Sequence, residues 1–270
     1  MRFIENFRSR DTVVRLGKAA ILPVVVFVIV TLVMWVHNPH QRGSTAHDQA
    51  PPVWHAPPGI SGSPDPPLPS GFPSMERPPP MIDVPKGVPH VIPTRYGLTY
   101  TVPAEGAWRP SNDMVAGWTD EVTNRTIVMY GSVSDYGYGY CPETDGSALA
   151  NVGVRGRNGL DVDTAAREEI GKAEQIFSDS ATGRKATVTV GEPTRWQIAD
   201  RTAVRYSAKI SGIPRKHSCD ATEAGFDIVA VPAYSSAEVA VFMIEHAIGP
   251  VRSLTDADID ATARSIKRTE

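Results

Sequence analysis

The chain has 270 residues with 24 prolines, two cysteines and a formal net charge of −3 at pH 7. This slightly negative charge argues against a nucleic-acid-binding protein that works by neutralising phosphates. Two cysteines are too few for a disulfide-dense miniature scaffold or a four-cysteine zinc site. The prolines are spread unevenly, and their distribution helps to divide the chain into four segments.

The N-terminal part predicts a membrane anchor. Residues 19–36 read AAILPVVVFVIVTLVMWV without a charge, and a helix of that length spans about 27 Å of hydrocarbon. Residues 1–18 carry five Lys or Arg, whereas only Arg42 follows within fifteen residues of the apolar segment. The positive-inside rule therefore places the 1–18 tail in the cytoplasm and the C-terminal part outside. A cleaved signal peptide is the alternative, but the residues around Trp35 form a poor cleavage site, which favours an uncleaved signal-anchor.

A proline-rich spacer follows the apolar segment. Residues 37–93 hold 16 prolines in 57 positions, in runs such as Pro78-Pro79-Pro80. Proline removes backbone donors and favours polyproline II, and few residues here could build a core. We therefore expect a disordered, semi-extended linker, with a PxxP ligand for a partner domain as the alternative.

Strand patterns dominate the remaining 177 residues, 94–270, which have 19 Lys and Arg against 24 Asp and Glu, a difference of −5. Apolar and polar residues alternate over 98–102, 186–190 and 203–210, which predicts half-buried strands. Residues 114–119 and 126–132 flank a polar turn and predict a hairpin. The runs 226–231 and 239–244 are almost continuously apolar, as in strands covered on both faces.

Two helices complete the expected domain. Asp163 is a plausible N-cap for a helix over 164–177, and Thr255 with Asp258 predicts a capping box for a helix that runs to about Lys267. Between the hairpin and the first helix we expect a long loop, 132–161, and loops of that length are often functional or cross-linked. The pattern predicts an α+β domain, with helices on a largely antiparallel sheet.

Cys141 and Cys219 lie in the part of the chain that the topology places outside the membrane. A pair of cysteines in an oxidising compartment predicts a disulfide. The alternative is a reactive or metal-binding thiol near His217, for which only Asp220 is close in sequence as a further ligand.

Few side chains indicate a site. Tyr136, Tyr138 and Tyr140 alternate with glycines; on a strand they would share one face and could stack on a sugar or peptide, or they pack over their own loop. Asp161 and Asp163 fit a helix start better than a catalytic pair of acids, and His246 fits a strand end better than a base. We identify no catalytic, cofactor-binding or metal-binding residue and expect no cofactor.

The stretch Gly97-Leu98-Thr99-Tyr100-Thr101-Val102-Pro103, followed by Trp108 and later by Cys141-Pro142 and Cys219, resembles a domain of actinobacterial membrane-anchored and lipid-anchored proteins. That family is of unknown function, and the resemblance covers about 96–268. It implies a PsbP/LpqN-like fold, a sheet covered by helices, and a bacterial cell envelope. It lends no catalytic residues.

Together these features predict a single-pass protein of the cell membrane with an extracytoplasmic domain. We expect a non-enzymatic binding or interaction module whose partner is an envelope protein or ligand, and not a nucleic acid. The alternative is a hydrolase that acts on envelope material, with a site near the 132–161 loop.

Overall fold

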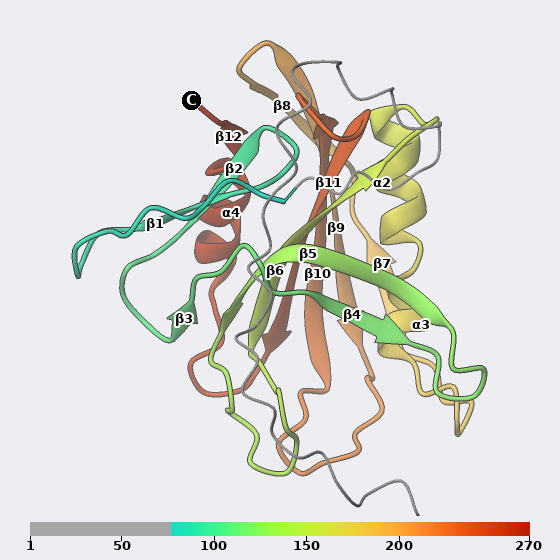
Figure 1. Ribbon diagram of the computed structural model, residues 1–270. Coiled ribbons are helices and arrows are strands. Elements are labelled where there is room, and N and C mark those ends of the chain that lie inside the picture. Colours follow the sequence, from blue (N-terminus) through green and yellow to red (C-terminus); the bar gives the residue numbers. More distant parts are fainter. Residues whose placement is uncertain (1–76) are drawn as a thin grey trace, which may run out of the picture. The chain divides into compact units, whose positions relative to one another are not determined.

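The computed structural model describes residues 77–270 (Figure 1). The expected tail (1–18), transmembrane helix (19–36) and residues 37–76 of the linker lie outside the described residues. Within 77–270, no helix is long and apolar enough to cross a membrane.

A nine-stranded antiparallel sheet forms the centre of the domain (Figure 1). In chain order its strands are β3 (Trp108–Arg109), β4 (Ala116–Thr119), β5 (Thr126–Tyr136), β6 (Ala150–Arg157), β7 (Thr187–Val190), β8 (Thr194–Ile198), β9 (Arg201–Ser211), β10 (Glu223–Pro232) and β11 (Val239–Ile248). Across the sheet the order is β3-β5-β6-β11-β10-β9-β7, with β4 beside β5 and β8 beside β9. The expected α+β class with a largely antiparallel sheet is confirmed, as is the β4–β5 hairpin.

A smaller sheet packs beside it, formed by β1 (His90–Pro93), β2 (Leu98–Val102) and β12 (Lys267–Arg268). β1 pairs with β2 along its whole length. The folded region therefore includes residues 90–93, which the sequence interpretation placed in the linker. Proline content suggested a spacer there, but Val91 and Ile92 supply enough apolar surface for a short strand at the sheet edge.

Three helices lie against the sheets: α2 (Val162–Ile170), α3 (Ala173–Phe177) and α4 (Asp256–Arg264). The expected helix over 164–177 is wrong in two respects. Its N-cap is Asp161, whose side chain accepts a hydrogen bond from Thr164 N at 2.9 Å, and the helix is interrupted at Gly171. Glycine is a poor helix former, so the chain restarts as α3.

The capping box of α4 is confirmed, with Thr255 and Asp258 bonded reciprocally. The helix nevertheless ends at Arg264 rather than near Lys267. Ser265 is its C-cap, and the next residues leave the helix because β12 pairs with β2.

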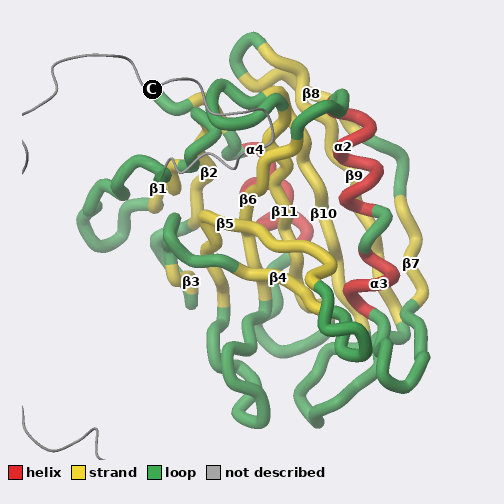
Figure 2. Tube along the Cα trace, turned by 45° about the vertical axis from the view of Figure 1, so that its right-hand side comes forward, coloured by secondary structure: helices red, strands yellow, loops and turns green. Residues whose placement is uncertain are grey.

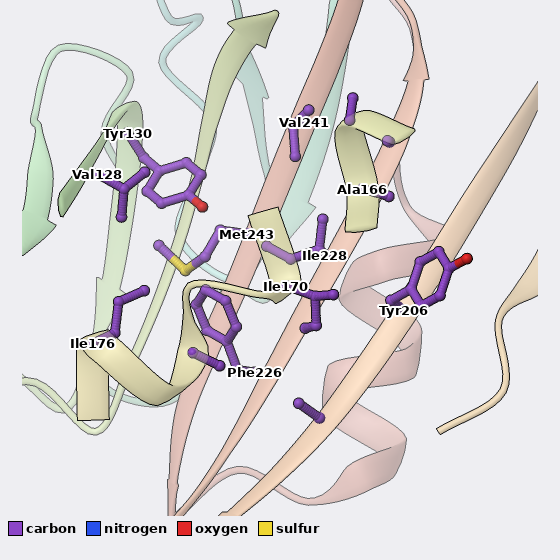
Figure 3. Packing of buried hydrophobic residues seen from close by; sticks show 14 of the residues in the cluster. Val128, Tyr130, Ala166, Ile170, Ile176, Tyr206, Phe226, Ile228, Val241 and Met243 are labelled. Atoms are coloured by element: carbon purple, nitrogen blue, oxygen red, sulfur yellow. The ribbon is translucent and has the colours of Figure 1, made fainter. Parts of the chain in front are cut away.

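Both faces of the large sheet are covered, and each has its own apolar core (Figure 2). Helices α2 and α3, with β4 and the first half of β5, cover one face, where Phe226 and Met243 are buried. Helix α4 and the small sheet cover the other, where Val229 and Phe242 are buried. Successive residues of β10 and β11 alternate between these cores, which confirms the expectation from their continuous apolar runs. Figure 3 shows the first core, with Ile170 and Ile176 of the helices packed toward Phe226.

The expected long loop over 132–161 is wrong. β5 continues to Tyr136, and β6 occupies residues 150–157, so only 137–149 connects the two strands. Val152 and Val154 carry an alternating signal, but Gly153, Gly156 and two arginines in the same stretch weaken it.

Candidate functional site

A wide opening lies where β5 and β6 separate. The two strands pair at 134–136 and again at Gly131↔Val154, with an irregularity between Gly131 and Ser134. Before that point β5 turns away and pairs with β4. Ser132, with a φ of 48°, takes the left-handed conformation at this bend. We call the gap between the diverging strands the β5–β6 seam.

A cavity of about 760 Å³ opens at the β5–β6 seam. That volume is within the usual range of small-ligand sites. The strand walls come from residues 129–132 and 154–156, and a loop wall comes from 112–115. A further wall comes from the end of the proline-rich stretch, 77–80, which Asn112 holds by donating a hydrogen bond from Nδ2 to Pro79 O at 2.7 Å. Residues 95–96, 158 and 236–237 complete the lining.

The lining of the cavity is both basic and apolar. Arg77, Arg95 and Arg155 line it, whereas Asp113 is the one acidic side chain among the described lining residues. This basic lining stands out because residues 94–270 have a charge difference of −5. Val115 and Met129 also line the cavity and are 65% and 51% exposed, so they offer apolar surface to a ligand.

Beneath the cavity, a buried acid holds two of its lining side chains in place. Glu169 of α2 is fully buried and accepts a hydrogen bond from Tyr130 Oη at 2.9 Å. Its carboxylate also pairs with Arg155 at 3.3 Å, Arg157 at 3.1 Å and Lys172 at 3.0 Å. Figure 3 shows the Tyr130 ring in the helix-covered core, above Met243.

The charge of Glu169 depends on these partners. Burial alone would raise the pKa of this carboxyl, but the positive charges of Arg155 and Lys172, with the hydrogen bonds that it accepts, bring the pKa below its ordinary value. Glu169 is therefore ionised at neutral pH and fixes Tyr130 and Arg155 in the floor of the cavity.

A comparison with known families matches residues 82–270 to a family described as Domain of unknown function (DUF8017). The chain belongs to the DUF8017 family. The match includes all the described strands and helices and the cavity wall except residues 77–80. No curated protein matches the chain. The finer resemblance to actinobacterial anchored proteins and to the PsbP/LpqN-like fold stays a prediction.

The structure of the DUF8017 domain places the three tyrosines outside the cavity. β5 ends at Tyr136, and Gly137 and Gly139 take positive φ values of 67° and 74°. The three rings therefore do not share the face of one strand. Tyr136 packs on Trp108 with 5.3 Å between ring centroids, and the Arg109 guanidinium lies 3.3 Å from the centroid of Tyr138.

Tyr140 lies further along the same connection, where burial is the main cause that raises its pKa. Tyr138 is 51% exposed. Ligand stacking by Tyr136, Tyr138 and Tyr140 stays a prediction.

Cys141 and Cys219 form the expected disulfide. It ties the connection between β5 and β6 to the one between β9 and β10, and no described cysteine is free. The alternative of a reactive or metal-binding thiol is therefore wrong for this pair. In residues 77–270 no group of three His, Cys, Asp or Glu side chains is arranged to hold a metal ion.

The two helix-start acids and the strand-end histidine make contacts within the fold. Asp161 caps α2, and Asp163 pairs with Arg167 and with Arg195. His246 is buried in β11 directly over Gly225, where burial lowers its pKa.

The basic residues of the cavity were missed by sequence reasoning. Arg155 belongs to β6, a strand that was not expected, and Arg95 precedes the first expected strand. Their clustering depends on the divergence of β5 from β6, for which the sequence carries no periodic signal.

Proposed function

We propose that this protein is a single-pass membrane protein whose DUF8017 domain is an extracytoplasmic binding module of the cell envelope, with the cavity at the β5–β6 seam as its binding site. The cavity itself carries this proposal. Three arginines and exposed apolar side chains line one opening in an otherwise acidic domain. Such a lining binds a ligand or partner that has both negative charge and apolar surface.

The disulfide supports the extracytoplasmic location. Disulfides persist mainly in oxidising compartments, and the positive charges of residues 1–18 favour the same orientation of the chain. The proline-rich stretch would then act as a spacer between the membrane and the domain. Protease added outside intact protoplasts should digest the domain. Digestion only after lysis would contradict the proposed orientation.

The lining suits a binding role. Its arginines can hold negative charge and its methionines, valines and prolines offer apolar surface, beside the polar side chains of Asp113, Ser132 and Ser236. The hydrolase alternative relied on a long open loop at 132–161, and β5 and β6 occupy residues 132–136 and 150–157 of that segment.

Site-directed photo-crosslinking tests the binding role in cells that naturally produce the protein. A photoreactive amino acid replaces Met129 at the cavity, and in a control it replaces Val251, which is 88% exposed and lies outside the cavity wall. We expect an adduct from position 129 and none from 251, and Arg77→Glu should weaken the adduct. Equal labelling from both positions, or none from 129, would show that the cavity is not the binding site.

A further inference from the structure

The cavity lies along an edge of β6 that pairs with no strand in the described residues, 77–270. In an antiparallel pair, alternate residues direct both their N–H and their C=O to the same neighbouring strand. Leu149 O accepts a hydrogen bond from Ala247 N at 2.8 Å, so the odd-numbered residues of β6 face β11. The even-numbered residues consequently face the β5 side.

Gly156 pairs with Ala240 of β11 on one side, but within residues 77–270 no strand lies beside it on the β5 side, toward which this alternation directs its N–H and C=O. Val154 still pairs with Gly131, but β5 has left the sheet two residues further along β6. The N–H and C=O of Gly156 thus point toward the seam, and Gly156 lines the cavity. No described strand pairs with β6 on this side at residues 155–157.

We propose that the natural occupant of the cavity is an acidic, extended segment of a partner protein, which adds to the edge of β6 as a strand. This inference rests on the proposed binding function and names the class of partner. Strand addition supplies backbone hydrogen bonds to Gly156, and the alternate side chains of the added segment reach the two sides of the groove.

Charge complementarity selects an acidic segment. Arg77 and Arg155 line the groove, and Arg155 pairs with Glu169 through Nη1, so its other donors can bind a carboxylate of the added strand. Arginine binds carboxylates with paired hydrogen bonds. The apolar side chains of the segment meet Val115 and Met129, which are exposed without it. A small anion would use the arginines but leave both the apolar surface and the β6 edge uncovered.

The proline-rich part of this chain is a poor occupant. Of residues 37–93, 16 are prolines, which lack the N–H that strand pairing needs. The end of that stretch, 77–80, already forms a wall of the groove. The observations therefore favour another protein over a segment of the same chain.

Selection from a random peptide library tests the proposal on the full-length protein in detergent micelles. We expect the selected peptides to alternate Asp or Glu with β-branched residues. Their affinity should fall about tenfold for Arg77→Glu, because a charge-assisted contact is lost. Arg125→Glu makes the same charge change at an exposed site outside the cavity and should leave the affinity unchanged. Selected peptides without acidic residues, or equal effects of the two variants, would overturn the proposal.

N-methylated versions of the selected peptide test the backbone pairing on the unaltered protein. Methylation at alternate residues removes the N–H groups of one edge of the added strand only. One methylated set should lose binding by about tenfold or more and the other should keep it. An equal response of both sets would show that the peptide is not an added strand.

Inorganic phosphate and phosphatidylglycerol vesicles serve as competitors at constant ionic strength. We expect neither to displace the peptide. Full displacement by phosphate would assign the cavity to a small anion, and displacement by vesicles would assign it to a lipid surface. Either result would overturn strand addition by an acidic segment. Crosslinking from position 129 could still succeed in cells, so the proposed binding role of the cavity and the proposed class of partner fail separately.

Discussion

Replacing the buried Glu169 tests whether this acid holds the floor of the cavity together. Glu169→Ala removes the acceptor of the Tyr130 hydroxyl and the shared counter-ion of Arg155, Arg157 and Lys172. Nothing else in this network carries a negative charge on a fully buried side chain. The substitution should therefore lower the free energy of unfolding and loosen the cavity wall.

The structure sets the size of the effect. Breaking a buried ion pair from one side typically costs about 3–5 kcal/mol. The three cationic side chains keep 19–30% exposure, so water can partly replace the lost carboxylate, and we expect about 3 kcal/mol, at the lower end. Glu169→Gln keeps an oxygen acceptor for the buried Tyr130 hydroxyl and should cost roughly 2 kcal/mol.

Urea unfolding of the full-length protein, followed by tryptophan fluorescence, measures these differences. Trp118 packs edge-on against Tyr130 and so reports on this region. Glu174→Gln is the matched control, because Glu174 makes an exposed ion pair with Lys185 and its loss should not be measurable.

The effect must also depend on pH. The pKa of Glu169 in the folded protein lies below its ordinary value, so its contribution is complete above the unfolded-state pKa and is lost as pH falls through the folded-state pKa. The difference between wild type and Glu169→Ala should shrink in acid. If Glu169→Ala lowers the free energy of unfolding by less than about 1 kcal/mol at neutral pH, or by an amount that does not change with pH, Glu169 is not a buried, charged anchor.

Three further changes test the fold. Reducing the disulfide, which spans 78 residues, should lower the free energy of unfolding by about 4 kcal/mol in urea titrations, and unchanged stability would mean that the bond is dispensable. Burial raises the pKa of Glu245 from 4.5 to about 7, so wild-type stability should fall as pH rises through that interval. Glu245→Gln should remove that fall and stabilise the protein by about 1–3 kcal/mol at pH 8 and not at pH 4. If wild type and Glu245→Gln show the same dependence of stability on pH, the raised pKa of Glu245 is contradicted. Gly225→Ala places a methyl group 2.0 Å from His246 Cε1 and should lower the melting temperature. In the control, Gly131→Ala, the added methyl group has no atom within 4 Å and should leave the melting temperature unchanged. Equal effects of the two variants would show that the His246 contact is unimportant.

Local sequence pattern was enough to predict much of the domain. The strands around Leu98, Val188 and Val204 are set by alternation, and β10 and β11 by continuous apolar runs, because side-chain period and burial are local properties of a strand. The capping box at Thr255 and the pairing of the two cysteines were likewise readable from residue types and spacing.

Local pattern was misleading where two signals compete. Asp161 and Asp163 are both able to cap α2, and only the backbone conformation at Asp161 decides between them. β6 was hidden because glycine and arginine interrupt its alternation, so the residues before it and after it were interpreted as one long loop.

The candidate site itself was decided by tertiary structure. Arg77, Arg95 and Arg155 are far apart in the chain and line one cavity only because β5 diverges from β6 on the N-terminal side of Gly131 and opens the seam between them. The role of Glu169 is also decided by tertiary structure. In the sequence it is one polar residue of an amphipathic helix, and it becomes a structural anchor because β6 brings Arg155 and Arg157 into contact with it. By itself the sequence determined the class of the folded domain, the apolar faces of its strands and the disulfide, which depend on local periodicity and composition. Only tertiary structure decided where charge is concentrated and which strand edge stays open, because both depend on contacts between distant residues.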